Sequence, residues 1–205
     1  FPYTTLFRSL SGIGTVTYIE KVSRRFGSLG HAVCDEAHES LTVADSSVYL
    51  CNIIGVNRGE RGRAGDLKGL FLSDDKIASA DKVCETGLYG TFDEDYDYSA
   101  LPTVEIAPLA AATIGSAVIY STIDGTEPQA YDVAIAKVDP NNKQNKNFVI
   151  KVTDEDLLRE TGGIVQGMSG SPIVQGGKLI GAVTHVFLND PTRGYGIGIE
   201  KMIGN

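Results

Sequence analysis

Short runs of alternating polar and apolar residues, separated by turn signals, constrain the fold of this chain more than any other feature. Gly14–Ile19 and Arg25–His31 both alternate in this way, and Glu20–Arg24 between them predicts a hairpin. Similar runs predict further strands at Ser47–Ile54, Thr103–Ile106, Ser116–Thr122, Ala130–Val138, Asn147–Val152, Ser171–Gln175, Lys178–Phe187 and Tyr195–Glu200. Gln175-Gly-Gly-Lys178 is typical of a tight hairpin turn. Many short strands in series predict an all-β antiparallel barrel or sandwich.

Helical signals are few. Thr153 or Asp154 can cap one short helix, and Gly162 can end it. Ser73–Ser99 is acidic and irregular, so we expect a solvated loop there. With 205 residues, the chain is long enough for one β-rich domain or for two small barrels that share an interface.

Charge and residue usage exclude several classes of function. The net charge is −8, and the one dense basic run, Asn57–Arg63, is short and glycine-rich, so we expect no nucleic-acid partner. The chain has three cysteines without a CxxC spacing and three histidines, so we expect no metal site and no cofactor. It has neither an apolar run of about 18 residues nor a secretory signal pattern.

The segment Gly167-Met-Ser-Gly-Ser-Pro172 carries the clearest chemistry. A serine hydroxyl is a weak nucleophile, and it needs a base within hydrogen-bond reach and donors for the charge that develops on the substrate oxygen. Glycines on both sides of Ser169 let successive N–H groups point into one pocket. We therefore predict Ser169 as a nucleophile, with the amides of Gly167 and Ser169 as its oxyanion hole.

The base must be one of the three histidines. His31 ends a predicted strand, whereas His38 lies in a polar run that predicts an exposed position. His185 lies on the strand after the nucleophile, where Val183, Thr184 and His185 are predicted to contact substrate backbone. The sequence therefore favours His31 as general base. Cys34 is a weaker alternative nucleophile, because its surroundings lack the glycines that flank Ser169.

Five segments together resemble the peptidase domain of the stage IV sporulation protein B (SpoIVB) family. They are Ser11-Gly-Ile-Gly-Thr15, Leu29-Gly-His31, Thr161-Gly-Gly-Ile-Val-Gln-Gly-Met-Ser-Gly-Ser-Pro172, Gly181-Ala-Val-Thr-His-Val186 and Asn189-Asp-Pro-Thr-Arg-Gly-Tyr-Gly196. The resemblance implies residues 11–205 as a serine endopeptidase domain with a chymotrypsin-like double antiparallel β-barrel and one or two short helices. The boundary between its two barrels is expected near residues 100–115, and residues 1–10 are expected to be a linker.

The resemblance also implies a triad of His31, Asp154 and Ser169. Asp154 lies only 15 residues before the serine and has a competing role as a helix cap, and Asp35, four residues after His31, is the rival acid. The acid would accept the imidazole N–H that faces away from the serine.

The family further implies a role in signalling during endospore formation, outside the cytoplasm, either membrane-associated or secreted. Its expected partners are a few protein substrates, with the protein itself as one candidate. A membrane anchor and a PDZ domain are expected upstream, outside this chain. The alternative function is a catalytically silent regulatory or peptide-binding module on the same fold.

Overall fold

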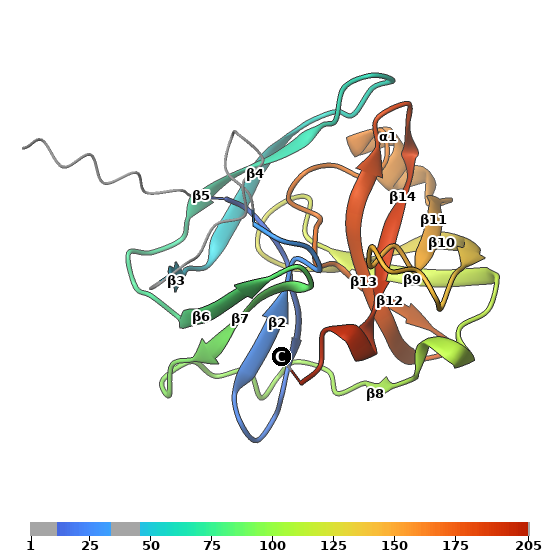
Figure 1. The fold of residues 1–205 in the computed structure, drawn as a ribbon. Helices are drawn as coiled ribbons and strands as arrows, with labels where there is room; N and C mark the ends of the chain where they lie inside the picture. The colour runs from blue at the N-terminus through green and yellow to red at the C-terminus, as the bar shows by residue number, and fades with distance from the viewer. Residues whose placement is uncertain (1–11, 34–45, 205) are drawn as a thin grey trace, which may run out of the picture.

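The computed structural model describes residues 12–33 and 46–204, and the second half of the chain forms a closed barrel (Figure 1). Its six antiparallel strands are β9 (Gly115–Ser121), β10 (Gln129–Val138), β11 (Phe148–Val152), β12 (Pro172–Gln175), β13 (Lys178–Phe187) and β14 (Asp190–Gly198). They pair in the order β12-β9-β10-β11-β14-β13, and pairing between β12 and β13 closes the ring. The short strand β8 (Glu105–Ile106) pairs in parallel with the start of β13.

Alternate residues of the barrel strands fill its interior. Tyr131, Val133 and Ile135 of β10 are buried, as are Phe148 and Ile150 of β11. This spacing of two follows from the pleat of a strand, which sends successive side chains to opposite faces. Burial of such apolar side chains supplies about 1.5–3 kcal/mol each, so the barrel is a rigid support for the loops at its ends.

The first half of the chain forms a five-stranded antiparallel sheet and a separate hairpin. The sheet has the order β1-β2-β7-β6-β3, with bounds β1 (Val16–Ile19), β2 (Arg25–Ser28), β3 (Ser46–Val48), β6 (Ala78–Cys84) and β7 (Gly87–Phe92). The hairpin consists of β4 (Cys51–Asn57) and β5 (Asp66–Phe71). Among the described residues, the strand pairings of this half do not close into a ring.

The predicted all-β fold is confirmed with one closed antiparallel barrel, whereas the described strands of the predicted first barrel form an open sheet and a hairpin. The predicted main turns are confirmed as well. The β1–β2 hairpin turns at Glu20–Arg24, and β12 and β13 join through Gly176 and Gly177, whose φ angles are 58° and 77°. Two consecutive positive φ angles belong to the type I′ turn, which glycine adopts without strain. Between β7 and β9 the stretch from Asp93 to Ile114 holds only β8 and η1, and the boundary predicted near residues 100–115 falls largely within it.

The prediction of a solvated loop at Ser73–Ser99 is wrong for Ala78–Phe92, where β6 and β7 form a hairpin. Ala78 and Ala80 of β6 lie in a buried cluster with Phe92 of β7 and Phe26 of β2. The rings of Phe26 and Phe92 meet edge-to-face at 5.3 Å. The buried residues of β6 are alanines and its exposed residues, Asp81 and Lys82, are charged, so its sequence lacks the apolar alternation by which a strand is predicted.

Three smaller differences concern strand bounds. The predicted strand Ser47–Ile54 is divided between β3 and β4, and β5 was not predicted. The last predicted strand, Tyr195–Glu200, begins earlier as β14 and ends in the 3₁₀ helix η2 (Ile199–Lys201). A second 3₁₀ helix, η1 (Leu109–Ala111), precedes β9.

The one predicted α-helix is confirmed as α1 (Glu155–Thr161). Asp154 is its N-cap, and Gly162 ends it in the left-handed conformation, with φ 76°. Within the described residues, no helix has the length and apolar character needed to span a bilayer.

Candidate active site

Ser169 lies on a loop that the barrel core and the first half of the chain hold from two sides. Met168 is fully buried in the barrel core. On the barrel side, Gly170 N donates to Val183 O at 2.8 Å and Val183 N donates to Ser171 O at 2.9 Å. Toward the first half, Thr15 N donates to Ser169 O at 2.9 Å. Ser169 is therefore held in place where the two halves of the chain meet.

Glycine is required beside the serine. Gly170 has φ +91°, and a Cβ there would lie 2.1 Å from Thr15 O and 2.6 Å from Leu29 N. Thr15 thus belongs to the site, although sequence reasoning gave it no role. The available signal was its place in Ser11-Gly-Ile-Gly-Thr15, one of the segments that carry the family resemblance.

The predicted oxyanion amides are available in this geometry. Gly167 has φ +101°, a conformation that L side chains rarely adopt. Neither Gly167 N nor Ser169 N donates a hydrogen bond to any described residue. Two amides that remain free around a serine are what a developing oxyanion requires.

His31 reaches the same region from the loop that follows β2. Leu29 and Gly30 have φ angles of +67° and +70°, and together they turn the chain sharply after Ser28. A Cβ on Gly30 would lie 2.9 Å from Thr184 Cγ2 and 2.9 Å from Ile197 Cγ2, so the loop rests directly on β13 and β14. The positive φ of Leu29 is a strained conformation that this packing maintains.

The imidazole of His31 is oriented by a backbone carbonyl. Its Nδ1 lies 2.8 Å from Ala32 O. Because a carbonyl only accepts, Nδ1 carries the proton and Nε2 keeps its lone pair, which is the tautomer that a general base needs. Burial lowers the pKa of His31 below its ordinary value of 6.5, and the bond to Ala32 opposes this shift in part.

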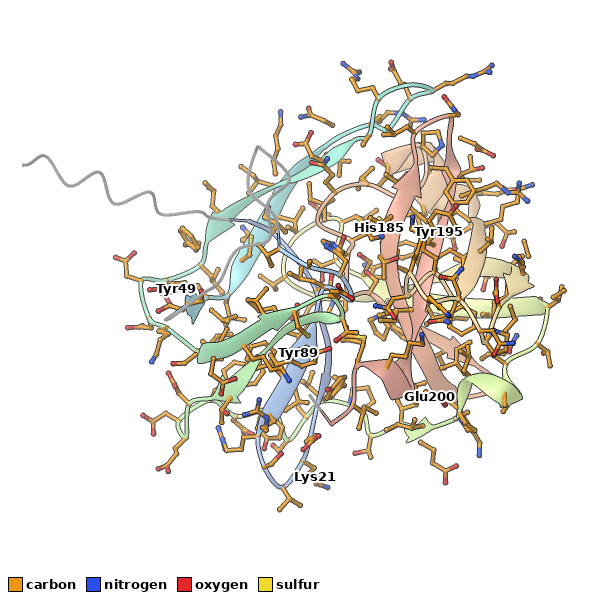
Figure 2. The ribbon with its side chains drawn as sticks, viewed as in Figure 1. Lys21, Tyr49, Tyr89, His185, Tyr195 and Glu200 are labelled. Atoms are coloured by element: carbon orange, nitrogen blue, oxygen red, sulfur yellow. The ribbon has the colours of Figure 1, made fainter. Side chains whose placement is uncertain are left out.

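His185 lies against His31, with 4.9 Å between ring centroids. It is an exposed residue of β13, opposite Tyr195 of β14, and both are labelled in Figure 2. Desolvation lowers the pKa of His185 to about 4, with further contributions from His31 and Lys146. Both imidazoles are therefore neutral at pH 7.

The three predicted substrate-contact residues have different surroundings. Val183 is fully buried, and both of its backbone polar groups bond the loop of Gly167–Pro172, so its backbone is not available to pair with an added strand. Thr184 O accepts the hydroxyl of Ser169 at 3.0 Å. The Thr184 hydroxyl is buried and has no hydrogen-bond partner among the described residues.

Beyond Val183, strand β13 has an open edge. β12 and the loop before it pair with β13 only as far as Val183, whereas His185–Phe187 pair with β14 alone among the described strands. An extended peptide can add to such an edge through main-chain hydrogen bonds. Of the predicted contact residues, His185 is the one exposed beside this edge.

Asp154 is placed apart from the histidines. Its carboxylate accepts from Leu157 N at 2.9 Å and from Asp132 N at 3.3 Å. His185, Tyr195 and Val149 lie in one row across the sheet. Asp154 is five residues beyond Val149 and past the end of β11 at Val152, which corresponds to about 16 Å of extended chain at ~3.3 Å per residue. The predicted contact between Asp154 and His31 is not formed in this structure, where Asp154 serves as a helix cap.

The other sequence candidates fall elsewhere. Cys34, Asp35 and His38 lie outside the described residues. Cys51 and Cys84 are partly buried free thiols. The described residues contain no cluster of three or more potential metal ligands.

Comparison with known proteins places this chain in a family. Residues 6–203 match the family model described as SpoIVB peptidase S55. Among solved structures, the chain is similar to Rv3671c from M. tuberculosis, in the inactive form of a serine-to-alanine mutant. The two share 14% sequence identity over 68% of each chain, with a TM-score of 0.44. No curated protein matches the chain. The family match covers nearly the whole sequence and confirms the resemblance predicted from its motifs.

Proposed function

Because this chain belongs to the SpoIVB peptidase S55 family of serine peptidases, we propose that Ser169 is its nucleophile and His31 its general base. Ser169 Oγ attacks the carbonyl carbon of the scissile peptide bond and passes its proton to His31 Nε2. The amides of Gly167 and Ser169 stabilise the oxyanion. The amine then leaves with the proton from Nε2, and water hydrolyses the acyl-enzyme.

One observation carries this assignment. The loop of His31 and the loop of Ser169 meet at the same point of β13, where Gly30 packs on Thr184 and Ser169 Oγ donates to Thr184 O. The bond from His31 Nδ1 to Ala32 O leaves Nε2 as the acceptor. Rotation of the Ser169 hydroxyl from the Thr184 carbonyl to Nε2 then activates the nucleophile.

A fluorophosphonate probe tests the proposal against a catalytically silent module. We expect one probe molecule per chain, and peptide mass spectrometry should locate it on Ser169. Ser171, two residues away in the same motif, supplies an internal reference that should stay unlabelled. Absence of labelling in the folded protein, or labelling at Ser171, would contradict the assignment.

Gly167→Val tests the oxyanion hole. Valine adopts φ +101° only with strain, and its Cβ would meet Leu67 Cδ1 at 2.9 Å, so the loop must shift and turn an amide away. Loss of one oxyanion donor lowers kcat by about 10²–10³. Gly115→Val is the matched control, since Gly115 also has positive φ but has nothing within 4 Å of its Cβ position. Equal kcat in the two variants would place the oxyanion hole elsewhere.

The pH profile reports on the base. His31 must be neutral to accept a proton, and burial lowers its pKa below 6.5. We expect kcat/KM to fall as the pH decreases through the lowered pKa of His31, so the acid limb should have its midpoint below pH 6.5. Measurement of kcat/KM from pH 4 to 8 checks this. A midpoint above 6.5 would contradict the assignment of His31 in this environment.

The group that supports the imidazolium is tested by two substitutions. Asp154 serves as a helix cap in this structure. We therefore expect Asp154→Asn to keep both fold and turnover, because asparagine caps helices about as well as aspartate. Asp35→Asn is the parallel variant. A loss on the order of 10⁴ in kcat, with the fold retained, would identify the acid in whichever variant shows it. Full activity in both would leave the Ala32 carbonyl as the group that orients His31.

The family supports a specific biological role for the peptidase. We place it in signalling during endospore formation, outside the cytoplasm, with a few protein substrates that include the protein itself. The open edge of β13 supports an extended peptide as the bound form. Incubation of wild-type enzyme with a separately tagged Ser169→Ala chain tests cleavage between copies. If the tagged chain is still intact after long incubation, the protein does not cleave other copies of itself.

A further inference from the structure

The segment that leads into the nucleophile is held by the β4–β5 hairpin of the first half. Gly59 N donates to Thr161 O at 2.8 Å, Gln166 N donates to Gly65 O at 2.8 Å, and Leu67 N donates to Gln166 O at 2.9 Å. In Figure 1 the hairpin extends from the first half across the top of the molecule toward α1. These three hydrogen bonds form a clamp at the loop end of the hairpin, which holds residues 161–166 directly ahead of Gly167.

Leu67 extends this clamp to the oxyanion glycine itself. A Cβ placed on Gly167 would lie 2.9 Å from Leu67 Cδ1 and 3.1 Å from Leu67 Cβ, so the leucine side chain rests on the Gly167 backbone. Leu67 is 6% exposed and belongs to the buried cluster of the barrel, as does Ile53 on the paired strand. Both come from the hairpin of the first half.

The far end of β5 is exposed. Leu70 and Phe71 are 59% and 66% exposed, respectively. The part of the hairpin near Leu67 is therefore packed against the catalytic loop, whereas the part near Leu70 projects into solvent. This contrast within one strand supplies matched residues for a test.

We infer that Leu67 is a positioning residue that holds Gly167 in the conformation that directs the oxyanion amides toward the substrate. This inference rests on the proposed role of Gly167. The conformation at φ +101° is one from which the backbone can relax when its support is lost. A misplacement of about 1 Å in a catalytic group can cost ~10²-fold in rate. The loss falls on the transition state, because the oxyanion forms only there.

The experiment compares Leu67→Ala with Leu70→Ala in this chain, on one peptide substrate. For Leu67→Ala we expect kcat to fall about 10²-fold with KM little changed, because the leucine acts through the oxyanion amides. Leu70→Ala should keep wild-type kcat. Leu67→Met restores most of the side-chain volume and should recover most of the rate. Thermal unfolding of each variant establishes that the assayed protein is folded.

The outcomes separate this inference from the proposed function. A folded Leu67→Ala with wild-type kcat, beside an inactive Gly167→Val, would overturn the role of Leu67 and leave the oxyanion assignment intact. Wild-type kcat in both would overturn the oxyanion assignment itself. If Leu67→Ala does not fold, Leu67→Val removes less volume and is measured in its place. A folded Leu67→Val should lose about tenfold in kcat, and wild-type kcat would overturn the inference.

Discussion

Ser169→Ala is expected to abolish peptide hydrolysis while the fold stays intact. The serine is half-buried, and the hydrogen bond that its side chain makes in the structure goes to Thr184 O. Its removal therefore leaves the backbone contacts of the loop unchanged, whereas the reaction loses its nucleophile. Removal of the serine in subtilisin lowers kcat by about 10⁶, and we expect a loss on that scale. Steady-state kinetics with a fluorogenic peptide, together with circular dichroism, provide the measurement.

Ser171→Ala is the control for this substitution. Ser171 is fully buried in the same motif, and its hydroxyl has no hydrogen-bond partner among the described residues. Its replacement tests whether any loss of a hydroxyl in this loop impairs the enzyme. Turnover in Ser169→Ala comparable with that of Ser171→Ala would show that Ser169 is not the nucleophile.

His31→Ala is expected to lower kcat by at least about 10²-fold, because loss of a general base costs ~10²–10⁴ in rate. Its imidazole packs beside His185, and its Nδ1 bonds the adjacent Ala32 carbonyl. Truncation therefore removes no long-range hydrogen bond from the fold. Measurement of kcat and KM with the same peptide gives the result.

His185→Ala is the informative comparison for the base. The two imidazoles are in contact, yet His185 lies beside the open edge of β13. We therefore expect its loss to act chiefly on KM. If His31→Ala kept more than about a tenth of wild-type kcat, or if His185→Ala showed the larger loss in kcat, the assignment of the base would be wrong.

Local signals were sufficient for many elements. The helix α1 follows from a capping aspartate, a short apolar stretch and a terminating glycine, all of which are adjacent in the chain. The β12–β13 hairpin follows from Gly176-Gly177, because two left-handed residues in a row nearly specify the turn. The barrel strands follow from apolar alternation, because each strand buries one face.

Strands β5, β6 and β7 could not be read in this way. Ala78 and Ala80 face the core of the first sheet, yet they give no apolar alternation large enough to stand out among the charged residues around them. Their burial depends on Phe26 and Phe92, which lie far from them or across a hairpin. Such contacts exist only after the chain has folded.

The sequence by itself indicated the Gly167–Pro172 motif and the β-rich architecture, because each is visible in residues that are close together in the chain. It favoured His31 among the three histidines as a prediction. Tertiary structure decided which groups meet. It set Asp154 on a helix terminus about 16 Å of extended chain from the row that contains His185, oriented His31 by a hydrogen bond from Nδ1 to the carbonyl of Ala32, and brought Leu67 onto Gly167. The contact between Leu67 and Gly167 joins segments 100 residues apart, and the separation of Asp154 from the histidines follows from strand register, neither of which sequence spacing encodes.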